Sequence, residues 1–270
     1  ILYTSSPDGE LHPDGHTFAH ADDINVIDAR QAHQQNIVTA ALKMSDDPKD
    51  HEHHHLAYEV VTLEGQAMSG RKGITLSIDE TIEEAIKRVK AIILEKTPNL
   101  ANIDTVARQV GVGALRLAML KSEAKRIIDF RWEQALSLQG DSAPYVQYAH
   151  ARASKILRDA AKAGLSTANA DFSKLGPLEA KLAQVVAKLP EVIQGAAREY
   201  TPHVVTQYAL DLAAAWNGYY NHKDANGKPD TKILEAEAGL REARLALVQK
   251  VKETLAESLS LLGIEAPEEM

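Results

Sequence analysis

The stretch SAPYVQYAHARASKILRDAAKAG, residues 142–164, decides how the second half of this 270-residue chain folds. Ser142 is a residue type that caps helix N-termini, because its side chain can accept a hydrogen bond from the first turn. Gly164 is the residue type that most often ends a helix. The residues between them predict one long helix, and the sequence from about residue 136 onward is helical almost throughout.

A further helix is predicted to begin at Thr201 and Pro202, which suit the N-cap and the first helical position. At helical spacing it carries the apolar residues Val205, Tyr208, Leu212, Trp216 and Tyr219. A polar, turn-rich loop, NHKDANGKPD, follows at residues 221–230. The last helix places on one side Leu245, Val248, Leu255, Leu259 and Leu262, and it stops at Gly263. Residues 136–270 therefore predict an up-and-down helical bundle.

Residues 1–135 have a different composition, in which strands alternate with helices. The β-branched run INVID (24–28) predicts a strand, and RQAHQQNIVTAALKM (30–44) predicts a helix. LAYEVVTL (56–63) and ITLSI (74–78) predict extended segments, and a helix is expected from Asp79. Another helix covers roughly 103–120, and RIIDF (126–130) is a strand or a connector. The order strand, helix, strand indicates an α/β unit with a parallel sheet.

Composition limits the function classes. Apolar residues make up 44% and charged residues 25% of the chain, as in a protein with a packed core, and no apolar run reaches the length of a membrane span. The absence of cysteine excludes disulfides and thiolate chemistry. The net charge of −8 argues against non-specific nucleic-acid binding, but a local basic patch can still bind phosphates. Because the chain begins at Ile1 within a loop-like stretch, we expect a fragment.

The run HEHHH at residues 51–55 contains the pattern His51-Glu52-x-x-His55 of zinc metalloproteases. That pattern works only on a helix, where both histidines share one face. Here Pro48 precedes it and a strand-like run follows, so a solvated loop is the favoured interpretation. Metal binding by the histidine cluster without catalysis is favoured over a zinc hydrolase, and no metal site is predicted.

The loop AMSGRKG (67–73) places Ser69, Arg71 and Lys72 on a glycine-hinged segment between two predicted strands. Small residues let the backbone approach a polyphosphate, and cations neutralise the charge that develops during transfer. Such a loop can also close over its ligand. A basic surface hairpin would have the same pattern, so the residues alone leave both interpretations open.

Several motifs in order resemble one family. MSGRKG resembles the signature loop of class I aminoacyl-tRNA synthetases in the form typical of arginyl-tRNA synthetases, and VIDARQAHQQ and HLAYEVVTL resemble the strands and helix before that loop. DSAPYVQYAHARASKIL and ARLALVQKVKETLAESLSLLGIEAPEEM are similar to segments of the anticodon-binding domain, with Glu-Ala-Arg-Leu at 242–245 in the region of its Asp-Ala-Leu-Arg motif. The resemblance covers nearly the whole chain.

The resemblance implies roles for particular residues. Catalysis falls to Met68, Ser69, Arg71 and Lys72, and binding of ATP or the amino acid to Asp28, Gln31, Gly70 and Gly73. Contacts with tRNA fall to Tyr148, Arg152, Lys155, Arg158, His203, Tyr219, Tyr220 and Met270. Asp28 and Gln31 could instead cap a helix. The aromatic residues could instead pack in the core, and the basic side chains could form a solvated face.

The sequence departs from the family pattern in places. Ala67 stands where many class I enzymes have the first lysine of the signature, and Gly70 stands at the second. The tetrapeptide His-Ile-Gly-His, the other class I signature, is absent, and HPDGH (12–16) has the wrong spacing to replace it. The charge of the transition state would therefore fall on Arg71, on Lys72 or on a lysine outside this chain.

The predicted fold is a partial α/β Rossmann-type catalytic domain with a connecting region over residues 1–135, followed by an all-α anticodon-binding bundle over 136–270. The resemblance implies an arginine–tRNA ligase with L-arginine, ATP with Mg²⁺ and the tRNA for arginine as its partners. It also implies no prosthetic group, no membrane, a monomer and a cytoplasmic location. We expect the fragment alone to be inactive. The alternatives are a non-catalytic tRNA-binding module and, less favoured, the zinc hydrolase.

Overall fold

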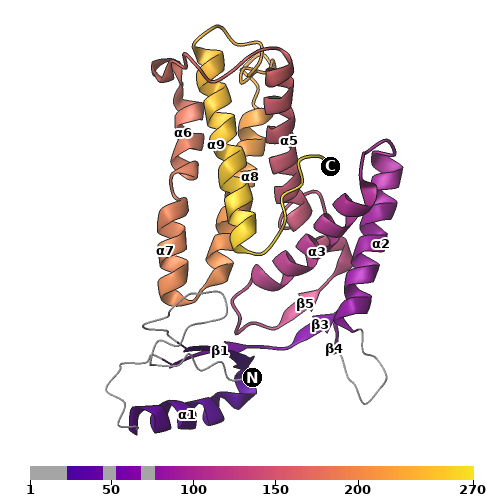
Figure 1. Ribbon diagram of the computed structural model, residues 1–270, viewed down its shortest axis with the longest axis vertical. Coiled ribbons are helices and arrows are strands. Elements are labelled where there is room, and N and C mark those ends of the chain that lie inside the picture. The colour runs from indigo at the N-terminus through magenta and orange to yellow at the C-terminus, as the bar shows by residue number, and fades with distance from the viewer. Residues whose placement is uncertain (1–22, 45–52, 68–76) are drawn as a thin grey trace, which may run out of the picture. The chain divides into compact units, whose positions relative to one another are not determined.

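The computed structural model describes residues 23–44, 53–67 and 77–270 of the chain (Figure 1). The strands of the described residues are β1 (Asp23–Asp28), β2 (His53–Tyr58), β3 (Val61–Leu63), β4 (Gln66–Ala67) and β5 (Ile128–Phe130). The longer helices are α1 (Ala32–Met44), α2 (Ile78–Lys96), α3 (Ile103–Leu120), α5 (Ala143–Lys162), α6 (Pro177–Val186), α7 (Leu189–Glu199), α8 (Pro202–Tyr220) and α9 (Leu240–Leu261). Shorter helical turns are η1 (Ala29–Gln31), α4 (Trp132–Ala135) and η3 (Phe172–Lys174).

The chain falls into two compact units. The first takes its described residues from Ile1–Thr62 and Ala124–Ile128, and the second comprises Leu63–Glu123 and Asp129–Met270. The expected boundary at 135/136 stays a prediction. No helix among the described residues is both long and apolar enough to cross a membrane.

The first unit contains the predicted strand, helix, strand sequence. Strands β1 and β2 pair in parallel, in the register Asp23 with His53 through Asp28 with Tyr58. A parallel pair needs a crossover connection, and α1 supplies it. Asn25 of β1 donates a hydrogen bond of 2.6 Å to Gln35, the buried residue of α1. This contact ties the helix to the sheet.

Two predicted extended segments differ from the structure. LAYEVVTL is not one strand, because the chain leaves β2 after Tyr58 and resumes extended pairing only in β3. Strands β4, β3 and β5 form a separate sheet in that order. The extended segment predicted for residues 74–78 is wrong at its C-terminal end, because Ser77 caps α2 and Ile78 is the first residue of that helix. Ser77 and Glu80 form a capping box, a local arrangement that overrides the β-branched run.

In the second unit α2 packs on α3, and α3 packs on α5 and α8. The approach of α2 and α3 depends on Gly111. A Cβ atom at this position would lie 3.0 Å from the backbone nitrogen of Ile86 and 3.1 Å from the carbonyl carbon of Ala85. Because these neighbours are backbone atoms of a helix, they cannot move aside as a flexible side chain could.

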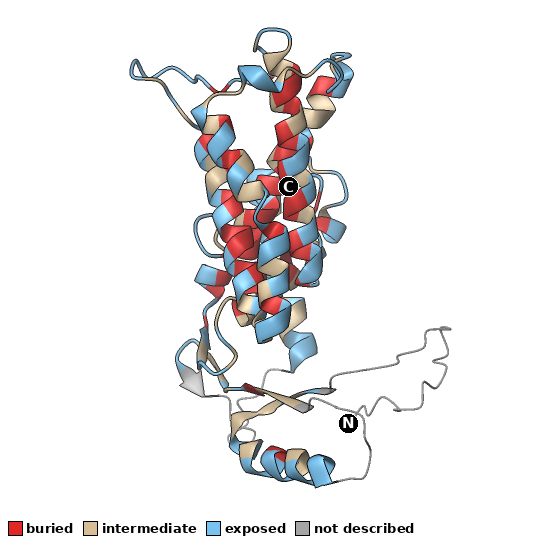
Figure 2. Cartoon of the chain, turned by 90° about the vertical axis from the view of Figure 1, so that its left-hand side faces the viewer, coloured by how far each residue is buried: buried red, intermediate tan, exposed pale blue. Residues whose placement is uncertain are grey.

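The core of the second unit lies among α5, α6, α7, α8 and α9, and Figure 2 shows its buried residues gathered inside the bundle. The stripe predicted on α8 is buried, and so is the stripe predicted on α9. Trp216 has no exposed surface, and its indole Nε1 donates a hydrogen bond of 3.1 Å to the carbonyl oxygen of Ala149 on α5. The predicted helical bundle is therefore confirmed.

One buried ion pair crosses this bundle. Arg244 of α9 contacts the carboxylate of Glu179 on α6 at 2.8 Å, and the phenol of Tyr219 donates to the same carboxylate at 2.9 Å. Burial would raise the pKa of the Glu179 carboxyl, but hydrogen bonds and the charge of Arg244 hold it below its ordinary value. Arg244 also donates to the carbonyls of Lys232 and Asp230. The pair therefore fixes the segment before α9 as well as three helices.

We predict that Gly111→Ala lowers the free energy of unfolding by about 1–3 kcal/mol, because the added methyl group forces α2 and α3 apart. Gly195→Ala is the matched control, since Gly195 lies within α7 with nothing near its missing Cβ. That control should raise the free energy of unfolding by up to about 1 kcal/mol through helix propensity. Urea unfolding followed by circular dichroism measures both, and equal stabilisation by the two substitutions would show that the close contact is absent.

Candidate nucleic-acid interface

Three side chains form a layered arrangement where α5 faces the end of α8. The guanidinium carbon of Arg152 lies 4.8 Å from the ring centre of Tyr148 and 4.7 Å from that of Tyr220. Arg152 also donates a hydrogen bond to the side-chain oxygen of Asn217. Tyr148 is 38% exposed and Tyr220 is 41% exposed, so both rings keep surface available to a partner. The arrangement is held in place yet open to solvent.

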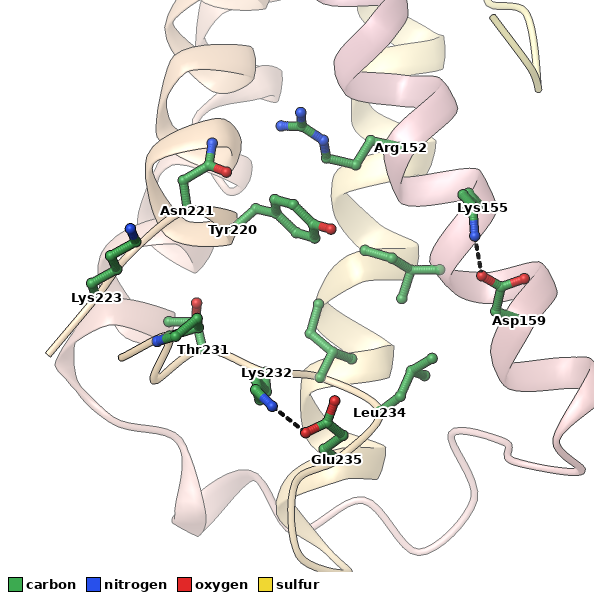
Figure 3. Close-up of a pocket in the computed structure, with 13 residues that line it drawn as sticks. Arg152, Lys155, Asp159, Tyr220, Asn221, Lys223, Thr231, Lys232, Leu234 and Glu235 are labelled. Atoms are coloured by element: carbon green, nitrogen blue, oxygen red, sulfur yellow. Dashed lines mark hydrogen bonds and ion pairs between the residues drawn. The ribbon is translucent and has the colours of Figure 1, made fainter. Parts of the chain in front are cut away.

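Beside these residues lies a groove of about 770 Å³ between α5, the end of α8 and the loop that leads to α9. Figure 3 shows Arg152 from α5 and Tyr220 from the end of α8 reaching toward one another, with Lys223 and Lys232 on the loop side. Its apolar lining comes from Ile156, Pro229, Ile233 and Leu234. The groove is therefore lined by apolar side chains, by the ring of Tyr220 and by charged side chains.

Charge in this groove is opposite to that of the chain. Four cations, Arg152, Lys155, Lys223 and Lys232, line it against two carboxylates, although the chain carries a net charge of −8. Lys155 pairs with Asp159 and Lys232 with Glu235, and all four side chains are substantially exposed. The hydrogen bond from Lys155 holds the pKa of the Asp159 carboxyl below its usual value. Because exposed pairs contribute little to stability, both lysines can exchange these partners for a phosphate.

The loop wall of the groove is fixed from the core side. Thr231 is buried, and its hydroxyl donates a hydrogen bond of 2.7 Å to the carbonyl oxygen of Tyr219. The guanidinium of Arg244 on α9 donates hydrogen bonds to the carbonyls of Lys232 and Asp230. The loop therefore has a defined place next to Tyr220, although it contains no helix or strand beyond an isolated antiparallel bridge between Lys223 and Pro229.

One predicted tRNA contact is corrected by burial. Tyr219 is 5% exposed, and its phenol is bonded to Glu179 inside the bundle. Burial raises the pKa of this phenol. A base could stack on Tyr219 only if the core unpacked, so the structure assigns Tyr219 to the core.

The predicted basic face of α5 divides into groups with different partners. Arg152 and Lys155 line the groove. Arg158 instead contacts the segment that follows α9, donating to the carbonyl of Glu268 at 2.9 Å and pairing with Glu269 at 3.1 Å. Arg158 therefore contacts the segment after α9 in this structure, and its contact with tRNA stays a prediction.

His203 is not brought together with the groove. It lies in the first turn of α8, whereas Tyr220 is the last residue of the same helix. At about 1.5 Å per residue, roughly 26 Å of helix separates them.

Met270 lies in a second, apolar pocket of about 280 Å³. Residues of α2 and α3, with Leu136, Leu138 and Pro144, line this pocket, and Tyr148 lines it together with Met270. Tyr148 thus contributes to this pocket and, through Arg152, to the arrangement at the groove. The structure places Met270 beside one of the exposed rings.

In the first unit the two predicted ligand-binding residues are close in sequence and differ in their surroundings. Asp28 ends β1, accepts from the backbone nitrogen of Arg30 at 2.8 Å and pairs with its guanidinium. The side-chain hydrogen bond from Arg30 lowers the pKa of the Asp28 carboxyl to about 2. Asp28 therefore caps the turn η1, the alternative role expected for it, and Gln31 is exposed.

The signature loop Met68, Ser69, Gly70, Arg71, Lys72 and Gly73 lies outside the described residues, as do His51 and Glu52 of the zinc pattern. The part of that pattern that is described argues against zinc. His55 lies in the strand β2, and its ring Nε2 is 3.1 Å from the carbonyl oxygen of Ile27. A strand cannot supply the helical face that the zinc motif needs.

Sequence reasoning did not identify Asn217, Lys223, Thr231 and Lys232 as parts of the site. The signal available for Asn217 was its spacing, three residues before Tyr220 on one helix face. The loop residues carry no periodic pattern. Thr231 and Lys232 are placed by bonds to Tyr219 and Arg244, and Lys223 is placed by an antiparallel bridge to Pro229.

Comparison with known families identifies both parts of the chain. The family described as tRNA synthetases class I (R), catalytic domain, matches residues 15–133. The family described as the DALR anticodon binding domain matches residues 146–270, the region that contains the groove.

Whole proteins agree with these matches. The chain is 49% identical to the arginine–tRNA ligase of Deinococcus radiodurans, with all of this chain and 45% of that protein aligned. It is 51% identical to the arginine–tRNA ligase of Thermus thermophilus, with all of this chain and 44% of that protein aligned. The chain thus spans about 45% of the length of the curated relatives it matches.

Solved structures show the same likeness. The arginyl-tRNA synthetase of Thermus thermophilus superimposes with a TM-score of 0.86 at 49% identity, over 96% of this chain and 43% of that one. The arginyl-tRNA synthetase of Plasmodium falciparum, at 19% identity and a TM-score of 0.71 over 92% of this chain and 41% of that one, shares the fold. The chain therefore belongs to the arginyl-tRNA synthetase family and joins part of a class I catalytic domain to a helical DALR anticodon-binding domain.

Proposed function

We propose that this chain acts as part of an arginine–tRNA ligase. The carboxylate of L-arginine attacks the α-phosphate of ATP to give arginyl-adenylate and pyrophosphate. A terminal ribose hydroxyl of the tRNA then attacks the carbonyl carbon of the adenylate, forms the arginyl ester and releases AMP. Support comes from the family matches over both parts of the chain. The observation that carries the proposal is the arginine held between two exposed tyrosine rings beside a cationic groove.

The exposed rings suit unpaired bases of a tRNA loop. Stacking of a base on an aromatic side chain contributes about 1–3 kcal/mol and tolerates every base. Arg152 supplies a planar cation between Tyr148 and Tyr220, and the lysines of the groove supply charge for the backbone phosphates. The apolar pocket shared by Tyr148 and Met270 would take one base out of water.

Activation of arginine would fall to the other part of the chain. We assign ATP, with the Mg²⁺ that its phosphates carry, to the loop Met68–Gly73, where Arg71 and Lys72 would neutralise phosphate charge and Ser69 would donate a hydrogen bond. Asp28 and Gln31 at the carboxyl end of β1 lie where α/β sheets bind ligands, so they remain candidates for the amino-acid side. We further propose a monomer in the cytoplasm.

We predict that the chain binds a tRNA for arginine and that Arg152→Ala weakens binding by about tenfold or more, the loss of at least 1.4 kcal/mol. Arg152→Lys should be intermediate, because it keeps the charge and loses the planar group. Lys250→Ala is the control, since Lys250 is an exposed cation of α9 paired with Glu253. Fluorescence anisotropy with labelled tRNA measures the dissociation constants. Equal affinity of all four proteins would refute this interface.

The groove lysines should act through phosphates. Lys223→Ala and Lys232→Ala should each reduce the slope of log affinity against log salt by about 0.7–0.9, the value for one phosphate contact. They should weaken binding of different tRNA sequences to the same extent. Titrations at several salt concentrations test this prediction. An unchanged slope in both variants would show that Lys223 and Lys232 do not contact tRNA phosphates.

The catalytic half can be tested in a chimera. We expect that the Thermus thermophilus ligase remains active when its matching segment is replaced by this chain, given their 51% identity. In that chimera Lys72→Ala should lower the rate of ATP–pyrophosphate exchange about 100-fold while leaving tRNA affinity unchanged, because it removes a contact made in the transition state. A folded chimera whose exchange rate is unaffected by Lys72→Ala would contradict the role of the signature loop.

A non-catalytic tRNA-binding module is the second candidate. It is favoured by one observation, that the groove and the exposed rings beside it all lie within residues 146–270, the part of the chain that the DALR anticodon binding domain matches. A folded chimera that binds tRNA but never activates arginine would support the module over the ligase.

A further inference from the structure

The segment Gly263–Met270, which follows α9, has no regular secondary structure yet is held at many points. In Figure 1 the yellow end of the chain turns away from the foot of α9 and runs back beside α5. Ile264 and Pro267 are buried. We call Gly263–Met270 the tail segment.

Two buried polar side chains of α5 contact the backbone of the tail segment. Gln147 has no exposed surface, and its Nε2 donates hydrogen bonds to the carbonyl of Glu265 at 2.8 Å and to that of Gln109 on α3 at 3.2 Å. His150 is 2% exposed, and its Nδ1 lies 2.9 Å from the carbonyl of Pro267. The two residues are three apart and therefore share one face of α5.

Stability alone does not account for this choice of residues. The Oε1 atom of Gln147 is buried and without a hydrogen-bond partner among the described residues, which costs about 1–3 kcal/mol. An apolar side chain of the same volume would avoid this cost, but it would leave the carbonyls of Gln109 and Glu265 without this donor. Burial also lowers the pKa of His150, although the backbone contact to Pro267 and the charge of Glu268 oppose that effect. The presence of Gln147 and His150 is better explained by the position that their contacts give to the tail segment.

Helix α3 has a glycine, Gly113, where Gln147 contacts the tail segment. A Cβ atom at Gly113 would lie 2.9 Å from Nε2 of Gln147 and 2.9 Å from Cγ2 of Ile264. The glycine leaves room for the amide of Gln147 to reach the tail segment. One side chain thereby joins α3, α5 and the tail.

The tail segment ends at the apolar pocket. Three residues beyond the bond to Pro267, Met270 lines the pocket of about 280 Å³ and packs against Val89, Val106 and Val110. Tyr148, the neighbour of Gln147 in sequence, lines the same pocket. The anchors and the pocket are therefore within one turn of α5.

We propose that Gln147 and His150 are positioning residues that fix the tail segment so that Met270 forms one wall of a base-binding pocket beside Tyr148. This inference rests on the proposed tRNA function. The side chains of Gln147 and His150 do not touch the base, and they act through the place they give to Met270.

A double-mutant cycle tests this. Gln147→Leu and His150→Leu should each weaken binding of a tRNA for arginine by the 270-residue chain about tenfold, and Met270→Ala should do the same. In the Met270→Ala background the two leucine substitutions should change affinity by less than about twofold, because they act through the side chain already removed. His150→Asn, which keeps a donor near the Nδ1 position, should restore most of the affinity lost in His150→Leu.

Thermal melts of every variant distinguish a displaced tail segment from a loss of folding stability. A merely structural role predicts lower melting temperatures with affinity losses that add fully to that of Met270→Ala, and this result would overturn the inference. Affinity unchanged by Met270→Ala but reduced by Arg152→Ala would also overturn it, while leaving the proposed function standing. If the wild-type chain binds no tRNA, both fall.

Discussion

The register of α5 against α8 is the constraint on which the proposed interface depends. It is set by the hydrogen bond from the buried indole of Trp216 to the carbonyl of Ala149. Arg152 lies one turn beyond Ala149, and Tyr220 lies one turn beyond Trp216, so the same register brings the guanidinium to the ring. A fully buried tryptophan thus determines the geometry of an exposed site. Because its ring fills the core, the register cannot slip without leaving a large cavity.

The surroundings of this site show how an acidic chain can present a cationic surface. Positive charge is in excess in the groove, and two of its lysines are paired with carboxylates in the absence of a partner. Such pairs keep the lysine side chains in place, while their exposure keeps them exchangeable. The rest of the chain has a net negative charge, which disfavours binding of nucleic acid elsewhere. Charge would therefore orient a bound nucleic acid as well as attract it. The buried pair of Glu179 and Arg244 has a different role, because it holds the loop wall from inside.

Much of the fold could be predicted from the sequence because it follows from periodicity. The apolar stripe of α8, the stop of α9 at Gly263 and the parallel pair around α1 are each the consequence of a local pattern. The site was predicted less fully. Tyr219 and Tyr220 are adjacent in sequence, and a rotation of about 100° between neighbouring helical residues buries one and exposes the other. The partner of Arg158 lies 110 residues away, and the groove loop is placed by contacts with other elements, so no local pattern could reveal either.

Crosslinking of a tRNA for arginine to the chain, with the crosslinked residues mapped by mass spectrometry, tests the central claim most directly. The account predicts that crosslinks concentrate in two stretches, around Tyr148 to Lys155 on α5 and from Tyr220 to Lys232 beyond α8. Crosslinks confined to other surfaces, such as α6 and α7, with those two stretches unmodified, would contradict it.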